Sequence, residues 1–314
     1  MEKIYDMLII GGGPGGYTAA LYAARAGLSV AVLERLSVGG QMALTHQIDN
    51  YPGFADGVDG FRLGDDMRRG AERFGAETIL TDVLSVDLQA EPKQVQTSEG
   101  LLWGRTVVMA TGASPRKLGL LHEEEFTGSG LSYCAHCDGM FFRGKTVAVI
   151  GGGNSAVGDA LILSRLCKEV ILIHRRDNLR ATRLYHKQLE EAGNIRILWN
   201  TVPKALLGEQ SLTGLRVQNT QSGAEQELSL DGVFVSIGRV PATELVKEQL
   251  TLADGYIVAD ESTETSLPGV YAVGDVRTKA LRQIITAAAD GAVAAHYAEE
   301  YLNSNSSLQH FGAL

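Results

Sequence analysis

One short unit occurs twice in the chain, and it constrains the fold more than any other feature. In each copy a short apolar run ends in a glycine-rich turn, and a helix-like segment and a second apolar run follow. The first copy begins with MLII and GGGPGG (7–16), the second with TVAVI and GGGNSA (146–156), and they align without a gap at an offset of 140 residues. We therefore expect an α/β protein with two Rossmann-like dinucleotide-binding domains.

The glycines of both turns have the spacing of a pyrophosphate-binding loop. In the pattern G-x-G-x-x-G the missing side chains let the backbone approach a pyrophosphate at the N-terminus of the following helix. The residues in these three places are Gly11, Gly13 and Gly16 in the first copy, and Gly151, Gly153 and Ala156 in the second. Each copy is thus predicted to bind a dinucleotide.

The two copies differ where their second apolar run ends. Glu34 stands there in the first copy, at a place where an acid accepts hydrogen bonds from a ribose. The same offset leads to His174 in the second copy, followed by Arg175, Arg176 and Arg180. Arginine binds phosphate in a forked geometry, so this cluster favours NADP(H) over NAD(H), the alternative being an ordinary solvated charged face. Sites of different charge predict a tightly held flavin in the first copy and a diffusing nicotinamide in the second.

Length and charge narrow the class of protein further. A chain of 314 residues exceeds the usual size of one core, so two domains are expected. The net charge of −9 argues against nonspecific binding to nucleic acid or anionic membranes. No apolar run approaches the roughly 20 residues of a membrane span, and MLII is too short for a signal peptide. We expect a cytoplasmic protein with no nucleic-acid or membrane partner.

Two of the three cysteines lie together in SYCAHCDGM (132–140). A structural zinc needs four ligands, and the sequence offers no second CxxC and no nearby Cys/His pair to complete the site. We therefore predict no metal site. The spacing instead allows Cys134 and Cys137 to form a small reactive disulfide that takes two electrons from a reduced flavin and passes them on by thiol exchange. Cys167 lies among helix-spaced apolar residues and is expected in the core.

From about residue 5 to residue 302 the chain resembles the low-molecular-weight thioredoxin reductases. The motifs GGGPGG, GGQM, NYPGF, ATGASPRKLG, SYCAHCDG, GGGNSA, HRRDNLRA, YAVGDV and RQIITAAADG occur in that family's order. The resemblance implies an FAD- and NADPH-dependent homodimer that reduces thioredoxin or a thioredoxin-like protein. It also implies a discontinuous FAD-binding domain (1–113 and 242–314), into which an NADPH-binding domain (114–241) with the cysteine pair is inserted.

The resemblance also assigns roles to single residues. It implies FAD contacts from Gly11, Gly13, Gly16, Glu34, Gln41, Asn50, Asp275, Arg282, Gln283 and Ile284. It implies NADPH contacts from Ser155, His174, Arg175, Arg176 and Arg180, beside the turn of Gly151 and Gly153. Cys137 would face the flavin, Cys134 would attack the disulfide of thioredoxin, and Asp138 would donate or accept a proton.

The chain departs from the family's pattern at two places. His136 stands where a small or β-branched residue is usual, and Gly158 and Asp159 replace an acidic pair. A protonated His136 lowers the pKa of a neighbouring thiol, the alternative being an exposed side chain without a role.

Other functions are compatible with the same scaffold. A dithiol oxidase and a ferredoxin-dependent thioredoxin reductase are alternatives, although both are expected to have lost the arginine cluster. An FAD-binding redox sensor without turnover is an alternative of another class, but it gives no reason for a second dinucleotide site. The final NSNSSLQHFGAL (303–314) is polar and is expected to be an irregular tail.

Overall fold

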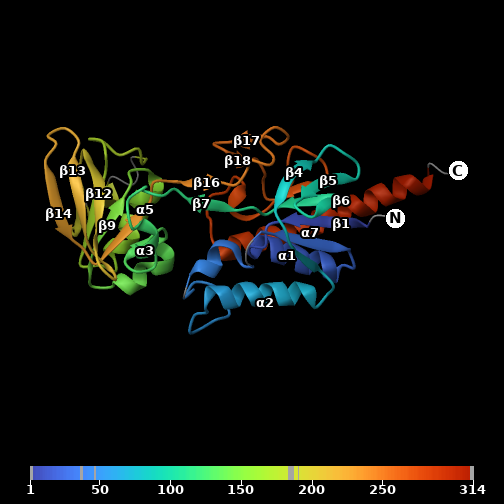
Figure 1. Ribbon diagram of the computed structural model, residues 1–314, viewed down its shortest axis with the longest axis horizontal. Coiled ribbons are helices and arrows are strands. Elements are labelled where there is room, and N and C mark those ends of the chain that lie inside the picture. Colours follow the sequence, from blue (N-terminus) through green and yellow to red (C-terminus); the bar gives the residue numbers. More distant parts are fainter. Residues whose placement is uncertain (1–2, 36–37, 46, 183–186, 190, 312–314) are drawn as a thin grey trace. The chain divides into compact units, whose positions relative to one another are not determined.

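A computed structural model describes residues 3–35, 38–45, 47–182, 187–189 and 191–311. The chain divides into two compact units. Unit 1 comprises Met1–Ser114 and Val240–Leu314, and unit 2 comprises Pro115–Arg239. Figure 1 shows the elements of both units.

Unit 1 is built on a seven-stranded sheet in the order β3-β2-β1-β6-β5-β4, with β19 paired to β6. The parallel strands are β1 (Ile4–Ile10), β2 (Val30–Glu34), β3 (Glu77–Leu80), β6 (Gly100–Met109) and β19 (Val270–Ala272). The antiparallel edge consists of β4 (Val83–Asp87) and β5 (Lys93–Thr97). Ile10 pairs with both Leu33 and Met109, so the carboxyl ends of β1, β2 and β6 lie at one edge of the sheet.

The two faces of this sheet are covered differently. Helices α1 (Pro14–Arg25), α2 (Gly60–Glu72) and α7 (Ile284–Phe311) contribute to the core on one face, against Met7 and Ile9 (Figure 1). Leu8 and Ile10 point to the other face, where β4, β5 and residues 245–259 cover them. Because both faces are buried, β1 is apolar over 7–10 and β2 over 30–33, without alternation.

The end of the chain differs from the expectation of an irregular tail. Helix α7 continues through residues 303–311, so that prediction was wrong for this part, and 312–314 lie outside the described residues. Once the Ala-rich beginning of α7 has formed, each added residue costs only its own helix propensity, and Ser, Asn and Gln are tolerated. In the part of the chain that the structure describes, no helix is long and apolar enough to cross a membrane.

Unit 2 repeats the plan with a five-stranded parallel sheet in the order β11-β10-β9-β15-β8. These strands are β8 (Leu131–Ser132), β9 (Thr146–Ile150), β10 (Glu169–Ile173), β11 (Ile195–Leu198) and β15 (Gly232–Val235). Helix α5 (Asn154–Ser164) packs on one face. A second sheet packs on the other, formed by β12 (Thr201–Gly208), β13 (Leu212–Asn219) and β14 (Glu225–Ser229).

Short elements complete the two units. They are η1 (Gly40–Leu44), β7 (Ala113–Pro115), α3 (Glu123–Phe126), α4 (Ala135–Asp138), η2 (Gly139–Phe142), β16 (Arg239–Pro241), β17 (Leu252–Ala253), β18 (Tyr256–Ile257) and η3 (Gly274–Val276). The predicted α/β fold, with one Rossmann-like unit inserted into another, is confirmed.

Candidate active site

The first glycine turn joins β1 to α1, and its glycines are required for different reasons. Gly11 has a φ of +112°, and a Cβ there would lie 2.3 Å from the Ala110 carbonyl oxygen. A Cβ on Gly16 would lie 2.0 Å from the Gly11 carbonyl oxygen, so this glycine lets α1 pack closely on the strand end. A Cβ on Gly13 would meet nothing within 4 Å. The open space at Gly13 beside the helix N-terminus fits the approach of a pyrophosphate.

Glu34 and Gln41 are both brought to this turn. Oε2 of Glu34, at the end of β2, accepts a hydrogen bond of 2.7 Å from the backbone N–H of Gly12. The segment before Gln41 is held by a hydrogen bond of 2.8 Å from the Gly39 N–H to the Gly12 carbonyl, which places η1 beside the turn. The structure therefore gathers these sequence-predicted FAD contacts around one backbone loop.

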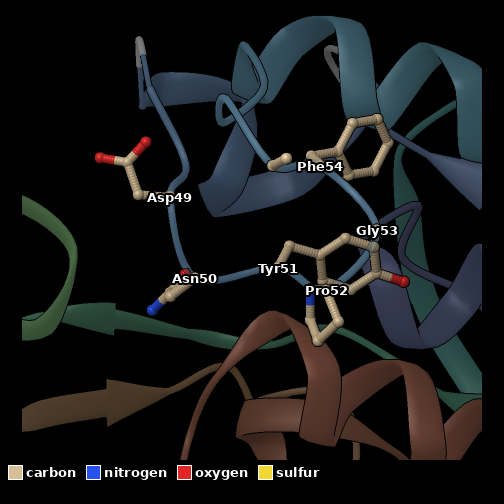
Figure 2. A pocket seen from close by; sticks show the side chains of 7 residues that line it. Asp49, Asn50, Tyr51, Pro52, Gly53 and Phe54 are labelled. Carbon is tan, nitrogen blue, oxygen red and sulfur yellow. The ribbon is translucent and has the colours of Figure 1, made fainter.

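A second group of predicted FAD contacts comes from distant parts of the chain. Asn50 Nδ2 donates a hydrogen bond of 3.0 Å to Gln283 Oε1, across 233 positions of sequence. Asn50 lines a pocket of about 560 Å³ formed by residues 49–55. In Figure 2 the side chains of Tyr51 and Pro52 lie next to each other in this loop. Gln283 immediately precedes α7, so the loop and the start of α7 belong to one site.

Arg282 also contacts this region of unit 1. Its Nε donates to the backbone carbonyl of Asp275 at 3.4 Å, and its guanidinium lies over the Tyr256 ring, 4.1 Å from the ring centroid. Asp275 belongs to the short turn η3, which Gly274 opens with a φ of +72°. Contacts within unit 1 therefore hold Arg282 next to Asp275.

The residue that anchors η3 is not among those that the sequence patterns single out. Asp290, buried in α7, accepts hydrogen bonds from the Gly274 N–H at 2.8 Å, from Arg277 Nη2 at 2.8 Å and from Lys279 Nζ at 2.7 Å. Burial opposes the charge of Asp290, but these donors outweigh it, and its pKa lies below the usual value. The signal in the sequence is the single acid within the apolar run ITAAADGAVAA.

The second glycine turn, between β9 and α5, has a similar geometry. Gly151 has a φ of +155°, and a Cβ there would lie 2.4 Å from the Ser236 carbonyl oxygen. A Cβ on Gly153 would meet nothing within 4 Å, and Ser155 is exposed in the first turn of α5. This turn also leaves space for a pyrophosphate at a helix N-terminus.

His174 and the arginines that follow it have different environments. His174 is only 5% exposed, and a Cβ on Gly152 would lie 2.2 Å from its ring. Burial lowers the pKa of His174, so its ring is neutral at pH 7 and supports the turn from within. Arg175, Arg176 and Arg180 are exposed, and the Arg180 N–H donates to the Gly152 carbonyl at 2.7 Å. The positive charge at this edge therefore belongs to the arginines alone.

Cys134 and Cys137 form a disulfide at the start of α4, with their Cα atoms 5.3 Å apart. Cys134 caps this short helix, and the Cys137 N–H donates to Cys134 Sγ at 3.2 Å. Cys167 is buried, and burial raises the pKa of its thiol to about 11, so it stays an unreactive core residue, as expected. The predicted redox pair is thus formed.

Asp138 lies beside the disulfide. Ser132 Oγ donates to Asp138 Oδ2 at 2.6 Å and accepts from the Cys134 N–H at 3.0 Å, so one hydroxyl connects the acid to the cysteine backbone. Burial raises the pKa of Asp138, although the Ser132 hydrogen bond acts in the opposite direction. A carboxyl with a raised pKa is suited to hold and release a proton near the sulfurs.

The two departures from the family's pattern lie within electrostatic reach of each other. Asp159 in α5 accepts a hydrogen bond from Ser236 Oγ. Burial raises the pKa of Asp159, whereas Ser236 and the charges of His136 and Arg239 act to lower it. His136 itself is exposed within α4.

Comparison with known proteins agrees with this geometry. Residues 5–291 match the family described as pyridine nucleotide-disulphide oxidoreductase. The thioredoxin reductase of Streptomyces clavuligerus is 46% identical over 306 residues (96% of this chain, 95% of the relative), and that of Treponema pallidum is 42% identical over 304 residues (97% and 99%). The crystal structure of thioredoxin reductase from Streptococcus pyogenes superposes with a TM-score of 0.89 at 41% identity, covering 97% of this chain and all of that one.

The chain therefore belongs to the pyridine nucleotide-disulphide oxidoreductase family. Within that family it is of the low-molecular-weight thioredoxin reductase type, which confirms the resemblance stated from the sequence. It is an oxidoreductase, and its family implies FAD and a nicotinamide dinucleotide as cofactors.

Proposed function

We propose that this enzyme passes electrons from NADPH through FAD to the Cys134–Cys137 disulfide, and from there to the disulfide of thioredoxin or a thioredoxin-like protein. One observation carries the proposal: a disulfide at the start of a short helix, in a chain with two complete dinucleotide-binding turns. A redox disulfide needs a flavin that passes electrons to it. The second turn would bind the nicotinamide dinucleotide that reduces this flavin.

Unit 1 would hold FAD. Gly13 leaves room for the pyrophosphate, and Gly11 and Gly16 allow the tight turn and the close packing of α1 that bring the backbone to it. Glu34 would accept hydrogen bonds from the ribose, and the remaining contacts would come from Gln41, Asn50, Asp275, Arg282, Gln283 and Ile284. When bound, FAD supplies the hydride acceptor that turns two electrons from a nicotinamide into the reduction of a disulfide. The compact units support an FAD domain of residues 1–113 and 242–314, and an NADPH domain of residues 114–241.

Unit 2 would bind NADPH in preference to NADH. Gly151, Gly153 and Ser155 would lie along the pyrophosphate, and Arg175, Arg176 and Arg180 would bind the 2′-phosphate, which NADH lacks. His174, buried and neutral, would hold the shape of the turn rather than add charge.

Once Cys134 and Cys137 are reduced, they would reduce thioredoxin by thiol–disulfide exchange. The thiolate of Cys134 attacks the thioredoxin disulfide, forms a mixed disulfide and releases one thioredoxin thiolate, which takes up a proton. The thiolate of Cys137 then attacks Cys134 Sγ, which restores the Cys134–Cys137 disulfide and releases the second thioredoxin thiolate. Asp138, with its raised pKa, would supply or accept the proton that these steps move. A homodimer in the reducing cytoplasm is part of this proposal.

Stopped-flow absorbance of the flavin tests the proposal. NADPH should bleach the flavin, and thioredoxin added next should restore its colour while two thioredoxin thiols appear. Bleaching of the flavin by a free small dithiol and restoration of its colour by oxygen, with no restoration by oxidised thioredoxin, would instead favour a dithiol oxidase. Colourless protein that cannot be reconstituted with FAD would contradict the whole proposal.

A further inference from the structure

Trp199 occupies a position that the proposed NADPH site does not yet use. It follows β11 directly, as His174 follows β10, and the two strands run parallel with Ile173 paired to Leu198. Both aromatic rings therefore emerge at the carboxyl edge of the unit 2 sheet. In doubly wound folds this edge is where dinucleotides bind.

The indole is held beside the second glycine turn through His174. The rings of Trp199 and His174 meet edge to face, with centroids 6.3 Å apart and an interplanar angle of 75°. The His174 ring in turn packs against Gly152. Backbone hydrogen bonds of 2.9 Å, from the His174 N–H to the Leu198 carbonyl and from the Thr201 N–H to the His174 carbonyl, fix the two segments to each other. The position of the indole is therefore set by the sheet.

Trp199 is not fully used in packing, because 36% of it is exposed. The exposed arginines of the same edge lie close to Trp199. Asn200, the residue after Trp199, donates a backbone hydrogen bond of 3.1 Å to the Arg176 carbonyl. None of Arg175, Arg176 and Arg180 forms an ion pair with a residue that the structure describes. The edge thus combines an exposed aromatic surface with unneutralised positive charge.

We propose that Trp199 forms a wall of the adenosine part of the NADPH site and stacks on the adenine, while the arginines bind the 2′-phosphate. The inference rests on the proposed function and adds a residue that determines affinity for the adenosine half. Stacking of a base on an aromatic side chain contributes about 1–3 kcal/mol, or roughly 5- to 150-fold in affinity. Adenosine 2′,5′-bisphosphate, the fragment of NADPH that carries both features, is the natural probe.

The chain has only two tryptophans, which makes a direct readout possible. In the Trp103→Phe holoenzyme all tryptophan emission comes from Trp199. Titration with adenosine 2′,5′-bisphosphate should change that emission saturably, and adenosine 5′-monophosphate should do the same at higher concentration. Emission that stays constant while calorimetry shows the bisphosphate bound would overturn the inference.

Calorimetry on three variants separates stacking from charge. Trp199→Ala should weaken both ligands by a similar factor, about tenfold, whereas Trp199→Phe, which keeps an aromatic face, should retain most of the affinity. Arg176→Ala should weaken the bisphosphate alone. Unchanged affinity in Trp199→Ala would refute the inference and leave the proposed function standing. Failure of the unmutated protein to bind the bisphosphate would instead refute the NADPH assignment itself. If Trp199→Ala does not fold, the emission titration and the Trp199→Phe variant still test whether Trp199 stacks on the adenine.

Discussion

The two glycine turns share a backbone design but differ in the residue that supports them. Gly11 and Gly151 both have a positive φ and both lie against a neighbouring carbonyl where a Cβ would clash. Gly13 and Gly153 both leave open space at a helix N-terminus. The shared features are those that any pyrophosphate requires of a backbone.

The difference lies 23 residues after the first glycine of each turn. Glu34 accepts a hydrogen bond from the Gly12 N–H, whereas the His174 ring packs on Gly152. Both side chains therefore contact the middle glycine of their turn, but one brings a negative charge and the other a neutral ring. In unit 2 the charge comes instead from the exposed arginines that follow. The residues at and after the end of the second strand therefore set the charge that each turn presents to a ligand.

The largest expected effect concerns the cysteine pair, which only unit 2 contains. Cys134→Ser and Cys137→Ser should each abolish thioredoxin reduction, because the exchange needs both an attacking and a resolving thiol. Flavin reduction by NADPH should persist in both, since hydride transfer to the flavin needs neither sulfur. Cys137→Ser should also accumulate a mixed disulfide through Cys134, visible on nonreducing gels. Thioredoxin reduction that survives either substitution would show that the pair is not the electron relay.

The arginines test whether charge distinguishes the two turns. Arg175→Ala with Arg176→Ala should remove most of the preference for NADPH over NADH, because each charge-assisted contact to phosphate contributes about 1.5–3 kcal/mol. The measurement is kcat/KM for flavin reduction with each nucleotide. NADH, which lacks the 2′-phosphate, is the matched control and should be affected little. Equal rates with both nucleotides in the unmutated protein would contradict the assignment of this edge.

The third position of the glycine pattern, Gly16 in unit 1 and Ala156 in unit 2, tests how closely each helix packs on its turn. Gly16→Ala places a Cβ 2.0 Å from the Gly11 carbonyl oxygen, so it should destabilise unit 1 by at least the 1–3 kcal/mol typical of overpacking and weaken FAD binding. The change Ala156→Gly at the equivalent place in unit 2 should cost about 1 kcal/mol from helix propensity and about 0.8 kcal/mol from the loss of a buried methyl group. Thermal unfolding and flavin retention would compare them. Unchanged stability and flavin retention in Gly16→Ala would contradict the close packing of α1 on its turn.

The smallest effects are pH dependences of opposite sign. The pKa of Asp138 is raised in the folded protein, so its contribution to stability is complete below the usual pKa and is lost as the pH rises through the raised one. The pKa of Asp290 is lowered, so its contribution is complete above the usual pKa and is lost as the pH falls through the lowered one. Each pKa unit corresponds to about 1.4 kcal/mol.

Urea unfolding of Asp138→Asn and Asp290→Asn across acidic pH would measure these contributions. Relative to the unmutated protein, Asp138→Asn should gain stability as the pH rises. Asp290→Asn should be most destabilising near neutral pH, where it removes a charged acceptor from Arg277 and Lys279. Parallel pH curves for both variants would contradict the two assignments.

Local patterns in the sequence were sufficient for the fold class and the redox pair. A strand, a glycine turn and a helix form within some 25 residues, and their backbone needs are visible as missing side chains at fixed spacing. Cys134 and Cys137 lie three positions apart, close enough for one short helix to bring them together. Charge after the second strand is also local, so Arg175 and Arg176 could be singled out before the structure was known.

Only the tertiary structure decided which distant residues meet. Asn50 meets Gln283, which lies 233 positions away in the sequence, and Asp290 in α7 anchors the turn that begins at Gly274. Trp199 lies beside His174 because β11 pairs with β10 in a particular register. Such contacts depend on strand order and helix docking, which are set by burial of whole faces rather than by any short stretch of residues. Burial also lowers the pKa of His174 and so favours its neutral form, because the cost of desolvating a charged ring arises only when the sheet and the turn enclose it.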